Sequence, residues 1–141
     1  MFLVARDAAD VSGFAYGYTG AYGHWWTDHV ARALTAGQRE EWLDPPHYEV
    51  VELHVLPARQ RQGVGSALLA QLLTRQPHDR AVLSTQAASR KARTFYAKNG
   101  WSELTSVEFG PGYPTYVVLG KNLVSPAART RFGYFPATDD T

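Results

Sequence analysis

The segment Gln60–Gly65 has the residue types and position of a phosphate-binding loop. It follows a run typical of a buried strand and precedes a helical pattern, and the first N–H groups of a helix have no partners within it. These N–H groups and the helix dipole favour an anion such as a pyrophosphate. Gly63 and Gly65 leave the backbone open to phosphates, and Arg59 and Arg61 add positive charge. On this segment alone, a strand–turn–helix whose glycines serve tight packing is an equally good interpretation.

Other binding chemistries fit the chain less well. A Walker loop ends in Gly-Lys-Ser or Gly-Lys-Thr, which is absent, and the third glycine of a dinucleotide fingerprint is replaced by Leu68. The chain has no cysteine, which excludes thiolate zinc sites and a cysteine acyl-enzyme. His24, His29 and His47 lack a convincing metal spacing, so we predict no metal.

A phosphate loop needs a strand before it and a helix after it, and the sequence predicts both. Tyr48–Leu56 is β-branched and mostly apolar, as in a strand covered on both faces. Pro57–Gln62 is expected to be a loop. Val64–Leu73 carries apolar residues at helical spacing and predicts an amphipathic helix.

The remaining segments predict a mixed α/β fold. The order of elements is strand, strand, helix, strand, helix, strand, helix, strand, strand. The additional elements are a hairpin of Phe2–Arg6 and Gly13–Thr19, a helix from Thr27 or Asp28 to about Leu43, a strand at Ala81–Thr85, a helix from a Ser89 cap to Asn99, and strands at Trp101–Phe109 and Thr115–Leu119. Ser125–Thr141 has no clear periodicity and is expected to be an irregular tail.

Composition narrows the class of protein. A length of 141 residues suits one domain. A net charge of +1 does not indicate the strongly basic surface that is typical of nucleic-acid-binding proteins. No apolar run approaches the ~20 residues needed to span a bilayer, and the N-terminus has no secretory signal pattern. The absence of cysteine fits a reducing cytosol, so we expect a cytoplasmic protein with neither membrane nor nucleic-acid partners.

Two motifs, taken together and in this order, resemble the GNAT superfamily of acetyl-CoA-dependent N-acetyltransferases. The first is Val55-Leu56-Pro57 followed by Gln60-x-x-Gly63-x-Gly65. The second is Ala92-x-x-Phe95-Tyr96-x-x-x-Gly100-Trp101, which alone would be read as core packing on a helix. The resemblance covers about Phe2 to Leu123. It implies a mixed, mostly antiparallel sheet with a splayed central strand pair, flanked by helices.

The resemblance implies acetyl-CoA as cosubstrate and an acetyl transfer to an amine, on a small molecule or a peptide, by direct attack in a ternary complex. The pantetheine would lie beside the central strand, the Val55 N–H would stabilise the oxyanion, and Tyr96 would protonate the leaving thiolate. The reference pKa of tyrosine, ~10, lies near the ~8.5 of a thiol. The implied cofactor-binding residues are His54, Val55, Gln60, Arg61, Gln62, Gly63, Val64, Gly65, Ser66 and Ser89. Ser89 stands where the family often has asparagine, and its alternative role is a helix cap.

The amine must lose a proton before it attacks, because an alkylamine with a pKa near ~10.4 is mostly protonated at neutral pH. Glu49 and Glu52 are the candidate bases, acting directly or through a water, and a regular strand places their side chains on opposite faces. A β-bulge would change this facing. We favour Glu52, nearer the thioester end, with His54 as a third candidate. At least one glutamate is expected to be solvated or paired with an arginine.

The resemblance also implies a first strand and two helices that have no counterpart before the hairpin. We therefore assign residues 1–124 to a GNAT domain without them and residues 125–141 to the tail. The Tyr22–His47 insertion is expected to wall the acceptor site in their place. Its aromatic residues and their neighbours predict an apolar pocket, or alternatively core or an oligomer interface: Tyr16, Tyr18, Tyr22, Trp25, Trp26, Trp42 and Tyr48.

Two alternatives remain open at the level of sequence. A non-catalytic acyl-CoA-binding or regulatory module is possible on the same fold, because fold does not fix function. The uncovered edge of the hairpin at Phe2 predicts a homodimer, and a monomer whose insertion packs back on its own sheet is the alternative.

Overall fold

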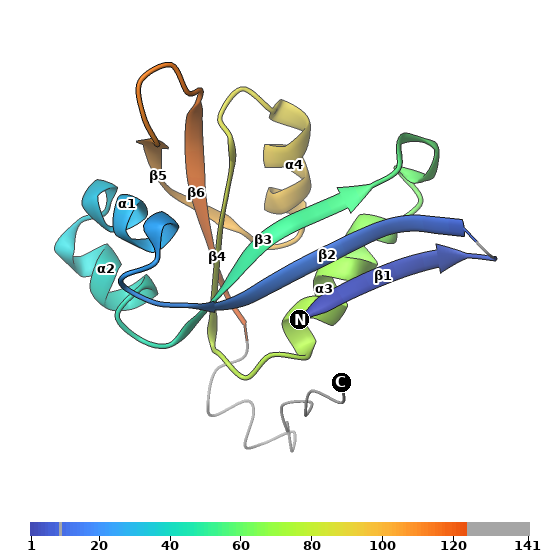
Figure 1. Ribbon diagram of the computed structural model, residues 1–141, viewed down its shortest axis with the longest axis horizontal. Coiled ribbons are helices and arrows are strands. Elements are labelled where there is room, and N and C mark those ends of the chain that lie inside the picture. Colours follow the sequence, from blue (N-terminus) through green and yellow to red (C-terminus); the bar gives the residue numbers. More distant parts are fainter. Residues whose placement is uncertain (9, 124–141) are drawn as a thin grey trace.

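The computed structural model describes residues 1–8 and 10–123, which form a six-stranded sheet with helices on both faces (Figure 1). The strand order is β1-β2-β3-β4-β6-β5, and every neighbouring pair is antiparallel except β3 and β4. The strands are β1 (Phe2–Asp7), β2 (Asp10–Gly20), β3 (His47–Val55), β4 (Arg80–Gln86), β5 (Ser102–Glu108) and β6 (Thr115–Asn122). The helices are α1 (Trp25–Ala33), α2 (Ala36–Trp42), a short 3₁₀ helix (Pro57–Arg59), α3 (Val64–Thr74) and α4 (Arg90–Lys98).

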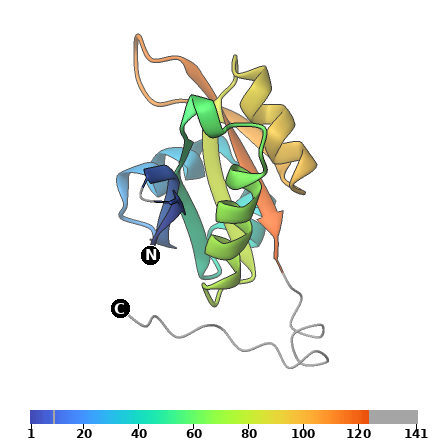
Figure 2. The ribbon, with the colours of Figure 1, turned by 90° about the vertical axis from the view of Figure 1, so that its right-hand side faces the viewer.

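The two faces of the sheet carry separate hydrophobic clusters. Val117 and Leu119 belong to the cluster beneath α3 and α4, whereas Val118 belongs to the cluster beneath α1 and α2. Successive strand residues point to opposite faces, so the two pairs of helices cover opposite faces of the sheet. Figure 2 shows α3 and α4 together on the near side of the sheet. This arrangement confirms the predicted α/β fold.

The central strands β3 and β4 separate shortly after they meet. They pair in parallel only at Tyr48 with Ala81 and at Glu49 with Val82. Beyond these pairs the two strands diverge, and α4 follows β4 on the far side of the gap (Figure 1). The splayed pair expected from the sequence is therefore present. The remaining backbone edge of β3 faces a gap instead of a neighbouring strand.

The insertion before β3 forms two helices, which corrects the single helix expected up to Leu43. Leu34 has an extended backbone, with φ −91° and ψ 150°, and ends α1. Thr35 then caps α2: its hydroxyl accepts from the Gln38 N–H at 3.1 Å, and the Gln38 side chain accepts from the Thr35 N–H at 3.0 Å. This reciprocal capping box starts a new helix in the middle of the predicted one.

The other predicted elements agree closely with the structure. β3 covers His47–Val55 where Tyr48–Leu56 was expected, and α3 and α4 begin and end within one residue of the predicted positions. The hairpin of β1 and β2 is present, with β2 longer than predicted at both ends. The tail at Ser125–Thr141 lies outside the described residues.

Candidate active site

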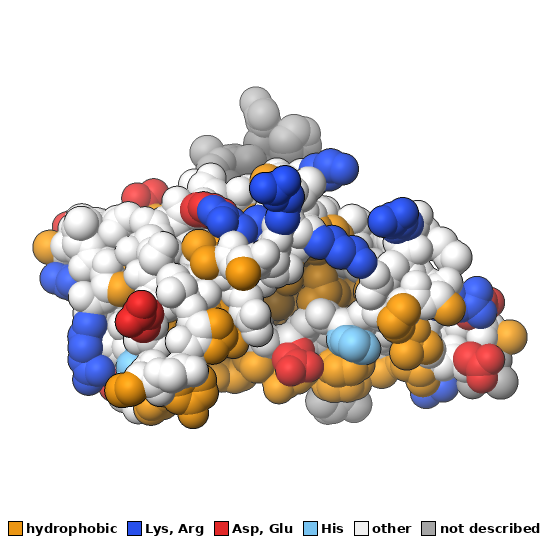
Figure 3. All heavy atoms as spheres, turned by 90° about the horizontal axis from the view of Figure 1, so that it is seen from above, with side chains coloured by type: hydrophobic (Ala, Val, Ile, Leu, Met, Phe, Trp, Pro, Cys, Tyr) orange, Lys and Arg blue, Asp and Glu red, His pale blue; other side chains and the backbone are white. Residues whose placement is uncertain are grey.

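A groove of about 900 Å³ lies between the end of β3, the start of α3 and the inner face of α4. Figure 3 looks onto the molecule from above and shows a hollow with apolar side chains inside it and Lys and Arg side chains along one rim. The lining residues are Leu53, Val55, Gln60, Arg61, Gly63, Gly65, Ser66, Ser89, Arg90, Lys91, Ala92, Thr94, Phe95, Tyr96 and Lys98. Both sequence motifs therefore contribute to one cavity.

The start of α3 forms the end of the groove that suits phosphate. Gly63 is the N-cap and has φ +80°, a left-handed conformation that glycine adopts without steric cost. Arg61 also has positive φ, 65°, so the chain turns sharply before the helix. A Cβ built on Gly65 would lie 3.4 Å from the Phe95 ring and 3.5 Å from the Val55 side chain, inside the groove. The first helical N–H groups, which have no partners within the helix, are thus left accessible.

The edge of β3 offers backbone hydrogen-bonding groups to the groove. Leu56 N–H donates to Ser12 O on β2 at 2.9 Å, so Leu56 faces β2. Because backbone groups alternate along a strand, Val55 and Leu53 face the gap and His54 faces β2. Gln60 supports this edge: its amide donates to Val55 O at 3.1 Å, and its side-chain oxygen accepts from the Lys91 ammonium of α4.

Seven of the ten residues predicted to bind the cofactor line this groove. They are Val55, Gln60, Arg61, Gly63, Gly65, Ser66 and Ser89. Gln62 and Val64 line a different groove between β1 and α3. His54 lies outside, because its backbone faces β2 and its ring packs against Phe14 at 5.7 Å between centroids on the opposite face. The Ser89 hydroxyl accepts from the Ala92 N–H at 3.3 Å, so it also caps α4 as the alternative interpretation proposed.

Three basic residues of α4 were not assigned to the site from the sequence. Arg90, Lys91 and Lys98 line the groove opposite the phosphate loop. The signal was present as a basic run at the start of the second motif, Arg90–Arg93. Its members face different ways: Arg93 forms an ion pair with Glu103 at 2.6 Å, outside the groove.

Tyr96 lies in the wall of the groove with its ring between two aromatic neighbours. Its centroid is 5.2 Å from that of Phe95 and 5.9 Å from that of Trp101, both in edge contacts. Burial raises the pKa of Tyr96 to about 12, above its ordinary value. Tyr96 is therefore protonated at neutral pH, and it is a weaker acid than a tyrosine with the reference pKa of ~10.

A β-bulge in β3 brings the two candidate glutamates to one face. Tyr48 and Val50 pack in the cluster beneath α3, so Glu49 points to the opposite face. Gly17 pairs with Val50 and Tyr16 pairs with Glu52, which leaves Val51 as an extra residue. Leu53 packs beneath α3 again, so Glu52 returns to the face of Glu49. The strand is therefore not regular, and the bulge considered from the sequence places both glutamates on one face.

The environments of these two glutamates differ. Glu52 is exposed, whereas Glu49 is only 4% exposed. Burial raises the pKa of Glu49 to about 7, and a hydrogen bond from the Tyr18 hydroxyl opposes this rise. The Glu49 Oε2 atom has no hydrogen-bond partner among the described residues. Glu49 therefore has the free acceptor oxygen and the pKa of a general base at neutral pH.

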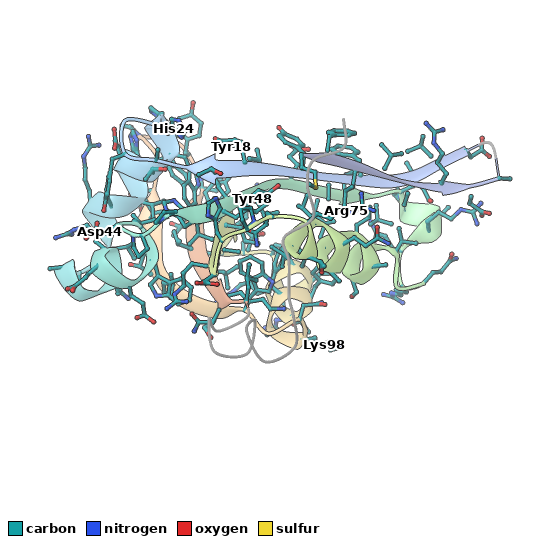
Figure 4. All side chains as sticks on the ribbon, turned by 90° about the horizontal axis from the view of Figure 1, so that it is seen from below. Tyr18, His24, Asp44, Tyr48, Arg75 and Lys98 are labelled. Atoms are coloured by element: carbon teal, nitrogen blue, oxygen red, sulfur yellow. The ribbon has the colours of Figure 1, made fainter. Side chains whose placement is uncertain are left out.

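Aromatic contacts connect the insertion to β2 and to the end of β5. Tyr18 contacts the His24 ring edge-on at 5.7 Å, and Trp25 contacts Phe109 at 5.3 Å, which connects α1 to the end of β5. Figure 4 shows Tyr18 and His24 on the side of the sheet away from Lys98. The predicted aromatic set is divided, because Trp42 and Tyr48 are buried core residues while Tyr18, Tyr22 and Trp25 are exposed.

Two further features of the described residues bear on the class of protein. No group of three or more His, Cys, Asp or Glu side chains among residues 1–8 and 10–123 is arranged to hold a metal ion. None of the helices in this part of the chain has the length and apolar character needed to cross a membrane.

The chain belongs to the GNAT acetyltransferase family. The family described as "Acetyltransferase (GNAT) domain" matches residues 1–103, which include the phosphate loop and the whole second motif. The splayed β3–β4 pair and the groove at the start of α3 lie within this match.

Known proteins similar to the chain agree with this family. A GCN5-like protein acetyltransferase of Mycobacterium tuberculosis, Rv2170, is 32% identical over 126 residues, which are 82% of this chain and 60% of that relative. The chain thus spans about 60% of the length of this curated relative.

Solved structures show the same fold at low sequence identity. Ard1 from Thermoplasma volcanium has a TM-score of 0.64 at 20% identity, over 88% of this chain and 71% of that one. Arabidopsis thaliana Naa50 in complex with the bisubstrate analogue CoA-Ac-MVNAL has a TM-score of 0.62 at 16% identity, over 86% of this chain and 72% of that one.

Proposed function

We propose that the protein transfers an acetyl group from acetyl-CoA to a primary amine, on a small molecule or a peptide, by direct attack in a ternary complex. The observation that carries this proposal is the single groove in which the start of α3, the free edge of β3 and Tyr96 meet. A phosphate-binding end and a proton donor in one cavity fit a cosubstrate that is long, anionic at one end and reactive at the other. The bisubstrate analogue bound to Naa50 joins CoA to an acetylated peptide, which supports this pairing of ligands.

Acetyl-CoA is proposed to lie along the groove with its pyrophosphate at the start of α3. The N–H groups after Gly63 would bind the phosphate oxygens, and Arg61 would supply positive charge. Arg90, Lys91 and Lys98 on the opposite wall favour the same anionic end. The pantetheine amides would then bond the gap-facing backbone groups of β3 that the oxyanion does not use, in the manner of an added strand; the Val55 carbonyl is already bonded to the Gln60 amide. The cofactor thereby occupies the space left between β3 and β4.

The acceptor amine is proposed to approach from the opposite face, where Glu49 is the base. Glu49 Oε2 takes a proton from the ammonium, and the neutral nitrogen attacks the thioester carbonyl. Glu49 replaces our sequence-based preference for Glu52, because burial raises the pKa of Glu49 to about 7, which suits a base at neutral pH, whereas Glu52 is exposed.

The tetrahedral intermediate needs a hydrogen-bond donor for its oxyanion, and its collapse needs one for the departing sulfur. The oxyanion can accept from the N–H of Val55, as the family resemblance implies, or from that of Leu53 on the same edge. The C–S bond then breaks, and the thiolate leaves with the electron pair. With a pKa of about 12, Tyr96 stabilises this thiolate first by a hydrogen bond from its hydroxyl. The attacking nitrogen loses its second proton as the amide forms, and the thiolate gains one proton in exchange, so coenzyme A is released as the thiol.

The test is acetyl-CoA turnover with a panel of amines and peptides, with binding of coenzyme A measured separately. An enzyme yields an acetylated amine and one coenzyme A for each acetyl group transferred. Binding of coenzyme A in the groove without turnover of any acceptor would instead identify the non-catalytic acyl-CoA module. We also propose that the protein is a homodimer.

A further inference from the structure

The outer edge of β1 carries backbone groups that no other described strand pairs. β1 is the first strand of the sheet and has β2 as its one neighbour within residues 1–8 and 10–123. Met1 N donates to Gly17 O at 2.9 Å, and Gly17 N donates to Met1 O at 3.2 Å, so Met1 faces β2. By alternation, the N–H and C=O groups of Phe2 and Val4 point away from β2. An unpaired apolar edge of this kind is a template for pairing with another strand.

The exposed side chains along this edge are apolar. Phe2 is 59% exposed and Val4 is 40% exposed, and both lie on the face opposite α3. The Phe2 ring stacks on Phe14 at 5.5 Å and on Tyr16 at 5.8 Å, which holds it in place. The edge is therefore an ordered surface and not only an exposed terminus.

A groove of about 430 Å³ runs beneath the same edge, between β1 and α3. Leu3–Asp7 form one wall, and Ala67, Gln71 and Arg75 of α3 are on the other. At one end, Asp7 forms an ion pair with Arg59 at 2.7 Å. At the other end lies Arg75, near the start of β1, where Figure 1 places the N-terminus beside the last turn of α3. Figure 4 shows Arg75 on the α3 side of β1.

We propose that two copies of this chain join through their β1 strands, which pair antiparallel about a twofold axis at Val4. Val4 of one copy then faces Val4 of the other, and Phe2 faces the partner's Arg6. Even-numbered positions meet even-numbered positions, so the two sheets join with their faces matched, and Val4 meets Val4 at the axis. The outward N–H and C=O groups of Val4 exchange both hydrogen bonds with the partner's Val4. The interface is self-complementary, as a twofold contact requires.

Charge favours a second copy as the occupant of this edge. In the antiparallel arrangement, the partner's Asp7 lies opposite Met1 and therefore beside Arg75 at the start of β1. The same contact recurs on the other side of the axis. Each groove carries Arg6, Arg59 and Arg75 but a single acidic residue, and the partner's Asp7, which pairs with Arg59 of its own chain, would lie beside this groove's Arg75 as well. The proposed dimer joins two sheets and leaves both acetyl-CoA grooves, on the far side of α3, uncovered.

Site-directed cross-linking tests this register, because the chain contains no cysteine of its own. Residues that exchange both hydrogen bonds have Cα atoms about 5.5 Å apart, within the range of a disulfide. We expect Val4→Cys to form a disulfide-linked dimer on mild oxidation. Phe2→Cys should cross-link with Arg6→Cys in a mixture but not with itself. Tyr113→Cys is the control, since Tyr113 is 67% exposed in the β5–β6 loop, far from this edge.

Charge-reversal variants test the same dimer independently, with the dimer affinity measured by light scattering at micromolar concentration. Asp7→Lys and Arg75→Glu should each weaken the dimer about two- to thirtyfold, because each removes two exposed ion pairs, one on either side of the axis, and the double variant should recover most of the affinity. A monomer mass at all concentrations overturns the proposal. A dimer in which Val4→Cys cross-links no faster than Tyr113→Cys overturns it as well. Neither readout uses acetyl transfer, so the outcome is independent of the proposed enzymatic function.

Discussion

Tyr18 and Glu49 face each other across β2 and β3, and the Tyr18 hydroxyl donates a hydrogen bond to the Glu49 carboxylate. The carboxylate is buried, yet its Oε2 atom has no partner among the described residues. Leaving a buried polar atom unpaired costs free energy, so such atoms mark sites where a ligand can supply the missing bond. This pair therefore connects the fold of the sheet to the chemistry of the acceptor.

The first prediction concerns the pH at which Glu49 acts. A base must be ionised, so kcat/KM should rise with pH and level off above the Glu49 pKa of about 7. Glu49→Gln should lower kcat by roughly 10²–10⁴-fold. Glu52→Gln is the matched control, because it changes an exposed glutamate on the same face. Its kcat should stay within a few-fold of that of the parent protein. A large loss in Glu52→Gln with an active Glu49→Gln would restore the sequence-based choice.

The second prediction concerns Tyr18 as a positioning residue. Its hydrogen bond lowers the pKa of Glu49, so Tyr18→Phe should raise that pKa and move the rise in kcat/KM to higher pH. The rate at high pH should largely recover, because the base itself remains. Tyr16→Phe removes a hydroxyl from the neighbouring residue of β2 on the same face. It should leave the pH midpoint of the rise in kcat/KM unchanged. If the midpoint in Tyr18→Phe equals that of the parent protein, the hydrogen bond does not set the ionisation of Glu49.

The third prediction concerns stability. The pKa of Glu49 is about 7 in the folded protein and near 4.5 in the unfolded chain, so Glu49 stays protonated to higher pH when the protein is folded. Stability contributed by this group is present below pH 4.5 and falls as pH rises to about 7. Relative to Glu49→Gln, the parent protein should lose on the order of 2–3 kcal/mol between acidic and mildly alkaline pH. Urea unfolding of both proteins at several pH values measures this difference, and equal pH dependence would contradict a raised pKa.

The sequence predicted the elements that bind the cofactor better than those that face the acceptor. The strand before Pro57, the turn at Gly63 and the two following helices have strong local signals: apolar runs, glycines and helix caps. Seven predicted residues consequently line one groove. His54 was misplaced with respect to the groove because the sequence does not show which backbone groups of an edge face the gap.

The acceptor side depended on irregularities that the sequence does not reveal. The extra residue Val51 decides that Glu49 and Glu52 share a face. The break at Leu34 arises from the Thr35–Gln38 capping box, a local pairing that competes with the continuous helical pattern across Gly37. Burial, and with it the difference between Glu49 and Glu52, is set by tertiary packing of the insertion and not by residue type.

The fourth prediction locates the cofactor. Gly65→Val places a branched side chain between Val55 and Phe95, where the groove must admit the cofactor. We expect its affinity for coenzyme A to fall at least about tenfold in calorimetry, a change of ~1.4 kcal/mol. Gly37→Val is the matched control, because nothing lies within 4 Å of a Cβ at that exposed position of α2. Unchanged affinity in a folded Gly65→Val protein would place the cofactor elsewhere.

The most direct test of acetyl transfer in this groove is to measure coenzyme A release and amine acetylation by the parent protein and by Tyr96→Phe. The substitution keeps the ring contacts with Phe95 and Trp101 and removes the hydroxyl. Acetylated product and coenzyme A should form in equal amounts with the parent protein. Tyr96→Phe should bind coenzyme A normally and lose roughly 10–10²-fold in kcat, the effect of losing a hydrogen bond to a charged atom. Parent-like turnover by Tyr96→Phe, or no turnover of any amine by a parent protein that binds coenzyme A, would contradict the account.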